Sequence, residues 1–202
     1  MAFSIYSTVI DPLLRGLRLQ VLRFSGMKAG DRVLDVCCGT GDQALHYARR
    51  GIIAAGIDLS PHMVRVAERN KRKHGLSNVS FQVGDATKLP FQDHCFDYAS
   101  ISLALHEKEM ASRDRIISEM KRVVRKEGIL IFVDFQVPLP RNPYTCLAEA
   151  IEFIAGREPQ LYFKDYSEQS GLEEMLRANQ LPQEKRDYLM SGLMVMIRAK
   201  NP

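Results

Sequence analysis

The stretch "RVLDVCCGTGDQALHYA", Arg32–Ala48, runs from apolar chain through two cysteines and two glycines into amphipathic chain. Its start predicts a buried strand over 32–37, and its end predicts a short helix over 41–51 that closes at Gly51. A disulfide, a metal centre or a nucleotide-binding turn could each place this pattern between a strand and a helix. The choice among the three decides the fold and the class of function.

The cysteines do not support the first two explanations. Cys37, Cys38, Cys95 and Cys146 include no CxxC pair. Neighbouring residues on a strand point to opposite faces, so a bond between Cys37 and Cys38 would be strained. A zinc site would show CxxC or His-x-x-x-His spacing nearby, and neither is present. We therefore expect reduced thiols and no metal.

Length and composition indicate one ordinary globular domain. The 202 residues are 46% hydrophobic and 26% charged, as in soluble proteins. No apolar run approaches the roughly 18 residues of a membrane span, and the first residues lack the pattern of a signal peptide. We expect a single domain over 1–202, without a membrane span and located in the cytoplasm.

The net charge of +4 is mild, and its densest cluster lies in 69–74. This cluster falls at the end of a predicted helix, where basic side chains favourably face the carbonyl end of the helix dipole. No aromatic residues are interleaved with it to stack bases. We interpret the cluster as a solvated helix end, which disfavours nucleic acid as a partner.

Strands and helices alternate outward from the opening stretch. A helical region over 5–24, divided at Asp11-Pro12, comes before it. The strands predicted after it cover 52–58, 79–85, 96–105 and 128–135, and the helices cover 60–75 and 108–128. Alternation of this kind implies right-handed crossovers and a mostly parallel sheet with helices on both faces. The predicted fold class is α/β, with a Rossmann-like, doubly wound sheet.

The regular alternation of strands and helices ends after residue 135. A proline-rich loop leads into predicted helices over 144–156 and 168–180. Two strands over 183–190 and 192–200 then follow, joined by a turn that contains Ser191 and Gly192. They predict a C-terminal antiparallel hairpin that completes a seven-stranded sheet.

The glycines fall where open α/β sheets bind ligands, beyond the carboxyl ends of the strands. Gly39 and Gly41 follow the first strand of the sheet, where glycine lets the backbone approach a ligand and adopt positive φ. The next helix offers its N-terminal amides. Asp58 ends the next strand and is placed to accept hydrogen bonds from both hydroxyls of a ribose. The alternative is that Asp58 only caps or shapes its turn.

Two cofactors fit this turn. Gly39-x-Gly41-x-x-Ala44 satisfies the relaxed dinucleotide pattern, which is weak evidence for NAD. Asp35, just before the turn, would oppose a pyrophosphate but could hold an ammonium group. Gly84-Asp85-Ala86 adds a carboxylate suited to an adenine amino group, and no Tyr-x-x-x-Lys pair is present. These features favour an adenosine ligand that also carries an ammonium group.

The segments "VLDVCCGTGD", "GIDLSPHMV", "VGDATKLPFQDHCFD" and "KEGILIFVDF" closely resemble class I S-adenosylmethionine-dependent methyltransferases. Within them the chain is most similar to the ubiquinone/menaquinone C-methyltransferase group and its small-molecule relatives. The resemblance covers 28–135, with a weaker echo in 192–200. It implies S-adenosylmethionine as cofactor, S-adenosylhomocysteine as product and a small-molecule acceptor, quinol-like or another apolar metabolite. An NAD-dependent oxidoreductase and a non-catalytic S-adenosylmethionine-binding module are the alternatives.

The family's first motif usually has Gly where this chain has Cys37, although some menaquinone-type relatives share the Cys-Cys form. The resemblance implies that Cys37 and Cys38 are small side chains tolerated by the turn, and not nucleophiles.

The resemblance also assigns cofactor contacts residue by residue. It places Asp35, Gly39 and Gly41 at the methionine part, with Cys37 and Thr40 of the same turn. It places Asp58 at the ribose, Leu59 and Met63 beside the adenine, and Gly84, Asp85 and Ala86 at the amino edge. Ser102 and Leu103 line the sulfonium, and Tyr6 belongs to an N-terminal helical lid over 1–27. Leu59 and Met63 have an equally simple explanation as core residues.

One side chain is a candidate base. An acidic acceptor must lose a proton on methylation, and His106 follows the fourth strand at the correct end of the sheet. Histidine's ordinary pKa, near 6.5, suits that task. The alternative is a histidine that caps the next helix or bonds the backbone. We interpret 136–166, which is rich in aromatic residues, as an insertion that caps the acceptor site; it could instead merely pack as a helical cap.

Overall fold

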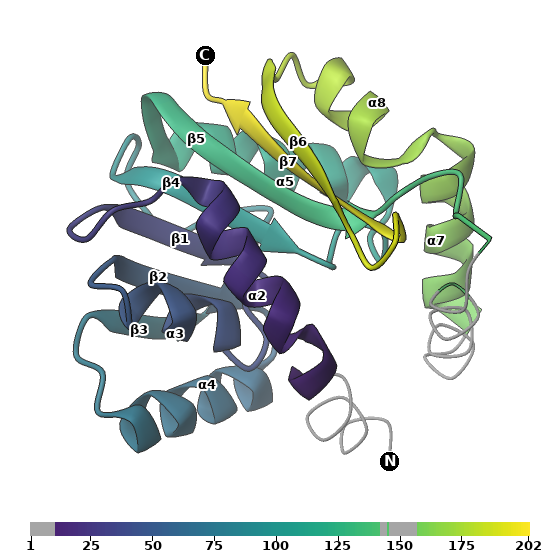
Figure 1. The fold of residues 1–202 in the computed structure, drawn as a ribbon. Coiled ribbons are helices and arrows are strands. Elements are labelled where there is room, and N and C mark those ends of the chain that lie inside the picture. The colour runs from purple at the N-terminus through teal and green to yellow at the C-terminus, as the bar shows by residue number, and fades with distance from the viewer. Residues whose placement is uncertain (1–10, 142–144, 146–156) are drawn as a thin grey trace.

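The computed structural model describes residues 11–141, 145 and 157–202, and Figure 1 shows them as one sheet with helices packed around it. The strands are β1 (Arg32–Val36), β2 (Ile53–Asp58), β3 (Val79–Val83), β4 (Phe96–Ser102), β5 (Val124–Phe135), β6 (Gln183–Leu189) and β7 (Met194–Lys200). The helices are α2 (Asp11–Ser25), α3 (Asp42–Ala48), α4 (Pro61–His74), α5 (Met110–Val123), α7 (Arg157–Glu168) and α8 (Gly171–Ala178). No helix in these ranges is both long and apolar enough to span a bilayer.

The sheet has seven strands in the order β3-β2-β1-β4-β5-β7-β6. Strands β1 to β5 pair in parallel, and β7 pairs antiparallel with both β5 and β6. This topology confirms the predicted Rossmann-like fold with a C-terminal antiparallel hairpin. The chain moves outward in one direction through β2 and β3, and then returns to β4 on the other side of β1. The strand order therefore reverses between β1 and β4, which is where such sheets bind ligands.

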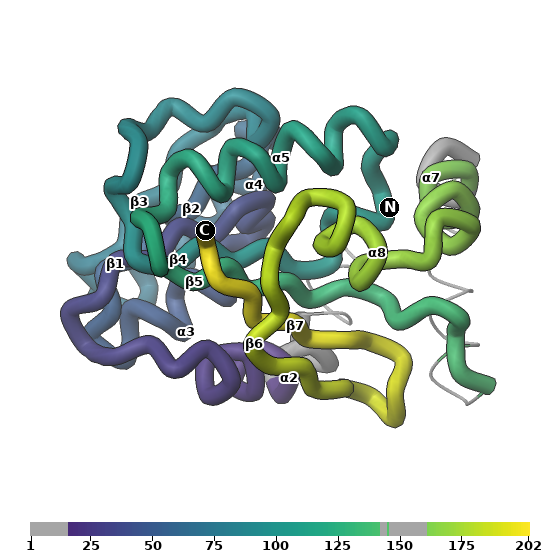
Figure 2. Tube along the Cα trace, turned by 90° about the horizontal axis from the view of Figure 1, so that it is seen from above, coloured from purple at the N-terminus to yellow at the C-terminus, as the bar shows by residue number. Residues whose placement is uncertain are grey.

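Right-handed crossovers decide which face each helix covers. The crossovers from β1 to β3 place α3 and α4 on one face, where α2 also packs against α3 and β7. The crossover from β4 to β5 runs in the opposite direction across the sheet, so α5 lies on the other face together with α8 (Figure 2). Both faces of the central strands are buried, and Val33, Leu34, Ile101 and Phe132 are at most 1% exposed.

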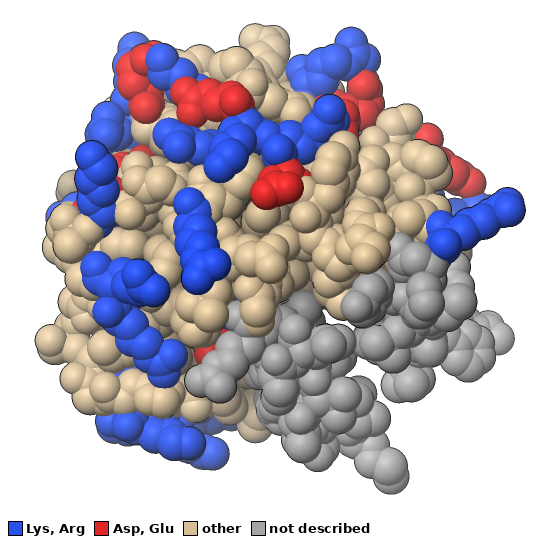
Figure 3. Space-filling model, viewed as in Figure 1, with Lys and Arg blue, Asp and Glu red and all other residues tan. Residues whose placement is uncertain are grey.

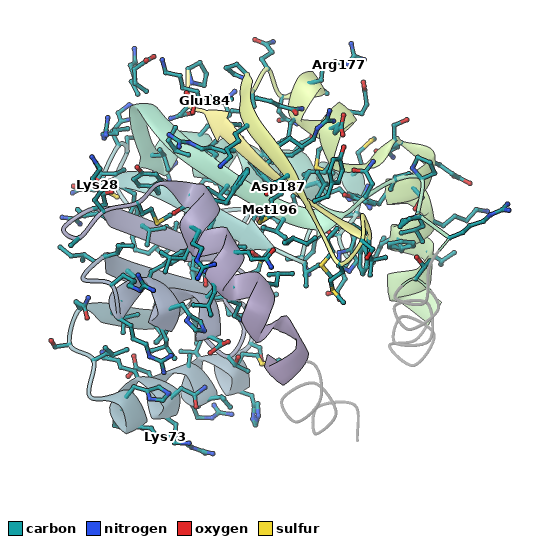
Figure 4. The ribbon with its side chains drawn as sticks, viewed as in Figure 1. Lys28, Lys73, Arg177, Glu184, Asp187 and Met196 are labelled. Atoms are coloured by element: carbon teal, nitrogen blue, oxygen red, sulfur yellow. The ribbon has the colours of Figure 1, made fainter. Side chains whose placement is uncertain are left out.

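Strand β6 is a charged edge of the sheet. Its first six residues are exposed. Figure 4 labels Glu184 and Asp187 on it, with Asp187 beside its partner Met196 of the buried strand β7. Charged side chains discourage another chain from pairing with an open edge. The hairpin that the sequence predicts thus ends the sheet without exposing an apolar strand.

The junction between α5 and β5 differs from the sequence prediction. The helix expected to continue to residue 128 ends at Val123, and β5 begins at Val124. Val124 already pairs with Phe96, and a bulge between Phe96 and Tyr98 adjusts the register. The pairing partner, rather than the helix-forming residues Arg125–Glu127, therefore decides the structure of this segment.

Helix α7 is a second difference, because the sequence pattern did not predict a helix over 157–168. In Figures 1 and 2 it stands beyond the end of the sheet where β5 finishes. The predicted helix over 144–156 and the predicted lid residue Tyr6 lie outside the described residues, apart from Thr145 in the former. Helix α2, which belongs to the predicted lid, begins at Asp11.

Candidate functional site

A cleft of about 660 Å³ opens at the carboxyl ends of β1, β2, β3 and β4. Most of the predicted cofactor contacts line it: Cys37, Gly39, Thr40, Asp58, Leu59, Met63, Gly84, Asp85, Ala86, Ser102 and Leu103. Asp35, Gly41 and His106 do not line it and lie close behind its wall. The cleft therefore brings together residues from the ends of four strands, β1 to β4, that are far apart in the sequence.

The turn after β1 forms one end of the cleft. Cys37, Gly39 and Gly41 all have positive φ, at 56°, 52° and 77°. A Cβ on Gly39 would meet nothing within 4 Å, whereas a Cβ on Gly41 would lie 2.6 Å from the ring of Phe81. Gly39 therefore leaves open space for a ligand, while Gly41 is required by packing beneath the turn.

Asp58 fastens this turn to β2. Its Oδ2 accepts a hydrogen bond from the Gly39 amide at 2.8 Å, and its Oδ1 accepts one from the Ser60 amide at 2.9 Å. A carboxylate offers about four acceptor positions, so each oxygen keeps one for a further donor. Asp58 thus shapes its turn, which was the alternative expectation from the sequence. It still has the capacity to accept hydrogen bonds from two hydroxyls.

The next residues form the wall of the cleft beside β2. Leu59 is 71% exposed and lines the cleft, so its alternative explanation as a core residue is wrong. Met63 is half-buried at the start of α4 and also lines the cleft. The hydroxyl of Ser60 accepts from the Met63 amide, which caps a helix that begins at Pro61 as predicted. An exposed leucine at a cleft is suited to covering a flat apolar ring.

Asp85 and Ser102 lie on other strand ends. Asp85 accepts hydrogen bonds from the amide and the hydroxyl of Thr87, which lower the pKa of its carboxyl group. The hydroxyl oxygen of Ser102 is buried and makes no hydrogen bond within the described part of the chain. Leu103, directly after it, has φ of 54°. A branched-chain residue held in this region indicates a backbone shaped by its surroundings, as often occurs at functional sites.

Asp35 is buried behind the turn and is 3% exposed. Its Oδ1 accepts a hydrogen bond from the Ser100 hydroxyl at 2.9 Å, while its buried Oδ2 makes none within the described ranges. Burial raises the pKa of this carboxyl group to about 7, although the charge of Arg18 opposes the shift. A buried carboxylate oxygen of this kind is suited to a cationic donor that arrives with a ligand.

His106 and Asp134 form a buried pair. Nδ1 of His106 lies 2.5 Å from Oδ1 of Asp134, and the two side chains are 3% and 1% exposed. Asp134 also accepts hydrogen bonds from the amides of Leu105, His106 and Phe135. Since Glu109 is the N-cap of α5, His106 does not cap that helix. An ionised carboxylate only accepts, so Nδ1 of His106 donates to Asp134, while Nε2 faces Oε1 of Glu107 at 3.8 Å.

Three aromatic rings surround the imidazole of His106. The ring centroids lie 4.8 Å away for Phe135, 5.9 Å for Phe163 and 6.4 Å for Tyr166. Phe135 ends β5, and the other two rings belong to α7. The histidine therefore faces an apolar wall, while Ala104 and Glu107, close to it in the chain, line the cleft.

The sequence reasoning missed several charged residues of the site. Arg18, Lys108 and Arg115 line the cleft, and nothing in the helical periodicity distinguishes them from surface cations. Asp134 could have been predicted as a site residue, because it is an acidic residue at the end of a predicted strand, as are Asp35 and Asp58. Among the described residues, no group of three or more His, Cys, Asp or Glu could hold a metal ion.

Comparisons with known proteins add a family to this geometry. The model of the family described as "Methyltransferase domain" matches residues 27–184. A demethylmenaquinone methyltransferase of Geobacillus kaustophilus is 32% identical over 164 residues, which cover 79% of this chain and 69% of the relative.

Two solved structures share the fold. A SAM-dependent methyltransferase from Aquifex aeolicus superposes with a TM-score of 0.70 at 20% identity, covering 92% of this chain and 89% of the other. Phosphoethanolamine N-methyltransferase 2 of Haemonchus contortus, solved in complex with S-adenosyl-L-methionine, superposes with a TM-score of 0.71 at 18% identity. That match covers 93% of this chain and 53% of the other.

Proposed function

This chain belongs to the methyltransferase domain family, and from that premise we propose that it methylates a quinol-like small molecule bound in the cleft on the side of His106. It is a class I S-adenosylmethionine-dependent methyltransferase, so its cofactor is S-adenosylmethionine and not NAD. The observation that carries the acceptor proposal is the buried His106–Asp134 pair, which packs against an apolar aromatic wall and is flanked in the chain by the cleft residues Ala104 and Glu107.

The residues of the cleft, together with Asp35 buried behind its glycine turn, fit this cofactor. The methionine part would lie in the open space above Gly39. The ribose hydroxyls would donate to the spare acceptor positions of Asp58. The ammonium group would donate to the buried Oδ2 of Asp35. Leu59 would cover one face of the adenine. When bound, S-adenosylmethionine supplies an electrophilic methyl group on a positively charged sulfur.

Arg18 supports the methionine end of the same site. Its guanidinium Nε lies 2.7 Å from Oδ2 of Asp42, and the side chain lines the cleft beside the glycine turn. A guanidinium has five N–H donors, so an ion pair with one carboxylate does not exhaust it. We assign to Arg18 the carboxylate group of the bound cofactor.

His106 and Asp134 supply what a quinol needs. A hydroxyl proton of the quinol passes to Nε2 of His106, and the phenolate that forms raises the electron density at the ring carbon that takes the methyl group. That carbon then gives up its own hydrogen as a proton, and the oxygen regains the proton held by His106. Asp134 holds the opposite nitrogen as a donor and stabilises the imidazolium that forms. The wall of Phe135, Phe163 and Tyr166 excludes water and accommodates an apolar acceptor.

The surface favours a small molecule over nucleic acid. In Figure 3, Lys and Arg outnumber Asp and Glu on this face; those near the top adjoin one another but have acidic side chains above and below them, and the others are scattered. A nucleic-acid site would instead show a continuous basic stripe. The described surface in this view thus supports a small-molecule acceptor.

The proposal is tested with purified protein, S-adenosylmethionine and 1,4-naphthohydroquinone under reducing conditions. Mass spectrometry should detect a singly methylated naphthoquinol and an equal amount of S-adenosylhomocysteine. Phosphoethanolamine serves as the matched alternative acceptor, because a neighbour in fold methylates it by name. Methylation of phosphoethanolamine without methylation of the quinol would contradict the proposed acceptor.

A further inference from the structure

Arg113 is the largest of the fully buried side chains, and no step of the proposed reaction uses it. It lies in the first turns of α5 and is 1% exposed. Burying a guanidinium is costly unless its donors are satisfied, so its partners indicate what the residue is for.

These partners lie on two segments that meet only in the folded chain. Nε donates to the carbonyl of Leu105 at 3.0 Å. Nη1 donates to Oδ2 of Asp165 at 2.7 Å, and Nη2 donates to the carbonyl of Tyr162 at 2.7 Å. One side chain therefore joins α7 to the residue directly before His106.

Tyr166 attaches the same helix a second time. Its ring lies under the guanidinium of Arg113, 5.5 Å from the ring centroid to Cζ. Its hydroxyl donates to the carbonyl of Phe135 at 2.9 Å, and burial raises the pKa of that hydroxyl so that it keeps its proton. Phe163 stacks against Tyr166 with an interplanar angle of 29°. The rings that face His106 are thus held by Arg113 from one side and by β5 from the other.

We propose that Arg113 is a positioning residue that sets the place of α7, so that Phe163 and Tyr166 form the acceptor wall against His106. The inference rests on the proposed function for the identity of the acceptor, but the contacts of Arg113 stand independently of it. The role requires arginine, because the planar fork of the guanidinium reaches Leu105, Tyr162 and Asp165 together. A lysine ammonium is a single point charge that cannot span them.

Helix α5 contains a matched control. Arg122 makes a comparable set of hydrogen bonds, to the carbonyls of Leu89 and Phe91 and to the carboxylates of Asp93 and Glu119. It fastens the loop before β4, and none of its hydrogen bonds within the described residues reaches α7 or His106. Its side chain is 32% exposed, whereas that of Arg113 is 1% exposed, so it matches Arg113 in bonding and not in burial. Arg122→Lys therefore measures the general cost of removing a well-bonded arginine from this helix.

The experiment compares Arg113→Lys, Arg122→Lys and Asp165→Asn. Asp165→Asn is included because its side chain is 42% exposed and its loss should not prevent folding. For Arg113→Lys we expect kcat/KM for 1,4-naphthohydroquinone to fall by roughly tenfold to a hundredfold, mostly through KM, because the wall is displaced. Amide hydrogen exchange over 157–168 should quicken by about tenfold or more, since bonds to a charged group are lost. The affinity for S-adenosylhomocysteine should be kept.

Asp165→Asn should also lower kcat/KM and quicken exchange over 157–168, but by smaller factors than Arg113→Lys. Arg122→Lys should change neither kcat/KM nor that exchange. Normal kinetics and exchange in Arg113→Lys would overturn the inference, as would equal effects in Arg122→Lys. A wild-type protein that binds S-adenosylhomocysteine but leaves the quinol unmethylated would contradict the proposed acceptor. In that case the exchange over α7 would still decide the positioning role of Arg113 by itself.

Discussion

Nδ1 of His106 and Oδ1 of Asp134 lie 2.5 Å apart although 28 residues separate them in the chain. The contact joins the loop after β4 to the end of β5, which are neighbours in the sheet. It orients the imidazole of His106 as the proposed base would require, because the carboxylate decides which ring nitrogen carries the proton.

Replacing that carboxylate tests the orientation directly. Asp134→Asn should lower kcat by roughly 10²–10⁴-fold, because the amide no longer holds the required tautomer or stabilises the imidazolium. The KM for S-adenosylmethionine should stay near its original value. Steady-state kinetics check this, and circular dichroism shows whether the variant folds. A variant that turns over at the original rate would leave Asp134 with a structural role only.

His106→Gln removes the base but keeps hydrogen-bonding capacity. Turnover should fall by roughly 10²–10⁴-fold while the affinity for S-adenosylhomocysteine is retained. The wild-type rate should increase with pH as the imidazole loses its proton, and the variant should lack that increase. If the pH profiles of the two proteins coincide at similar rates, His106 is part of the wall and not the base.

Asp58→Ala should affect binding and folding together. The loss of two hydrogen bonds from ribose hydroxyls should cost roughly 2–4 kcal/mol of cofactor affinity, taking bonds to charged groups at 1.5–3 kcal/mol with incomplete additivity. The free energy of unfolding should also fall by about 1–3 kcal/mol, because the amides of Gly39 and Ser60 lose their acceptor. Calorimetry and urea denaturation measure the two effects. Unchanged binding would show that Asp58 only shapes its turn.

Asp35 should make both folding and binding depend on pH. Its folded pKa of about 7 lies above the ordinary 3.8, so the folded state holds a proton that the unfolded state loses between pH 4 and 7. The free energy of unfolding should therefore fall as the pH rises through that window, by about 4 kcal/mol for this group alone. Affinity for S-adenosylhomocysteine should rise over the upper part of the same window, because its ammonium group favours the carboxylate.

Asp35→Asn separates these two effects. The variant should be more stable than the wild type at pH 8, because it removes a buried charge, and it should bind the product more weakly by about 1.5–3 kcal/mol. Thermal unfolding at pH 5 and pH 8 gives the stability difference. Weaker binding without any gain in stability at pH 8 would contradict the raised pKa.

Gly39 and Gly41 form a matched pair, since both have positive φ and only one is closely packed. Alanine at either position carries the same kind of backbone strain. Gly41→Ala should be destabilising by about 1–3 kcal/mol beyond Gly39→Ala, because its Cβ meets the ring of Phe81. Gly39→Ala should instead weaken cofactor binding more than Gly41→Ala. Equal effects of the two variants on both properties would contradict the division of roles.

The sequence was sufficient for the sheet and for most of the cleft. Strand and helix periodicity, together with glycines and carboxylates at strand ends, predicted the order of elements and the places of Gly39, Asp58 and Asp85. These signals are local: an alternating or helical pattern, and a position just after a strand. Parallel strands then bring their carboxyl ends to one edge regardless of the details of packing.

The tertiary structure alone decided which residues act together. The start of β5 at Val124, the orientation of His106 by Asp134 and the attachment of α7 through Arg113 all depend on partners at least 28 residues away. No window of sequence contains both members of such a pair, and each member alone is an ordinary strand, loop or helix residue. The free energy that selects these contacts comes from burial shared between distant segments, so it exists only once the chain has closed around them.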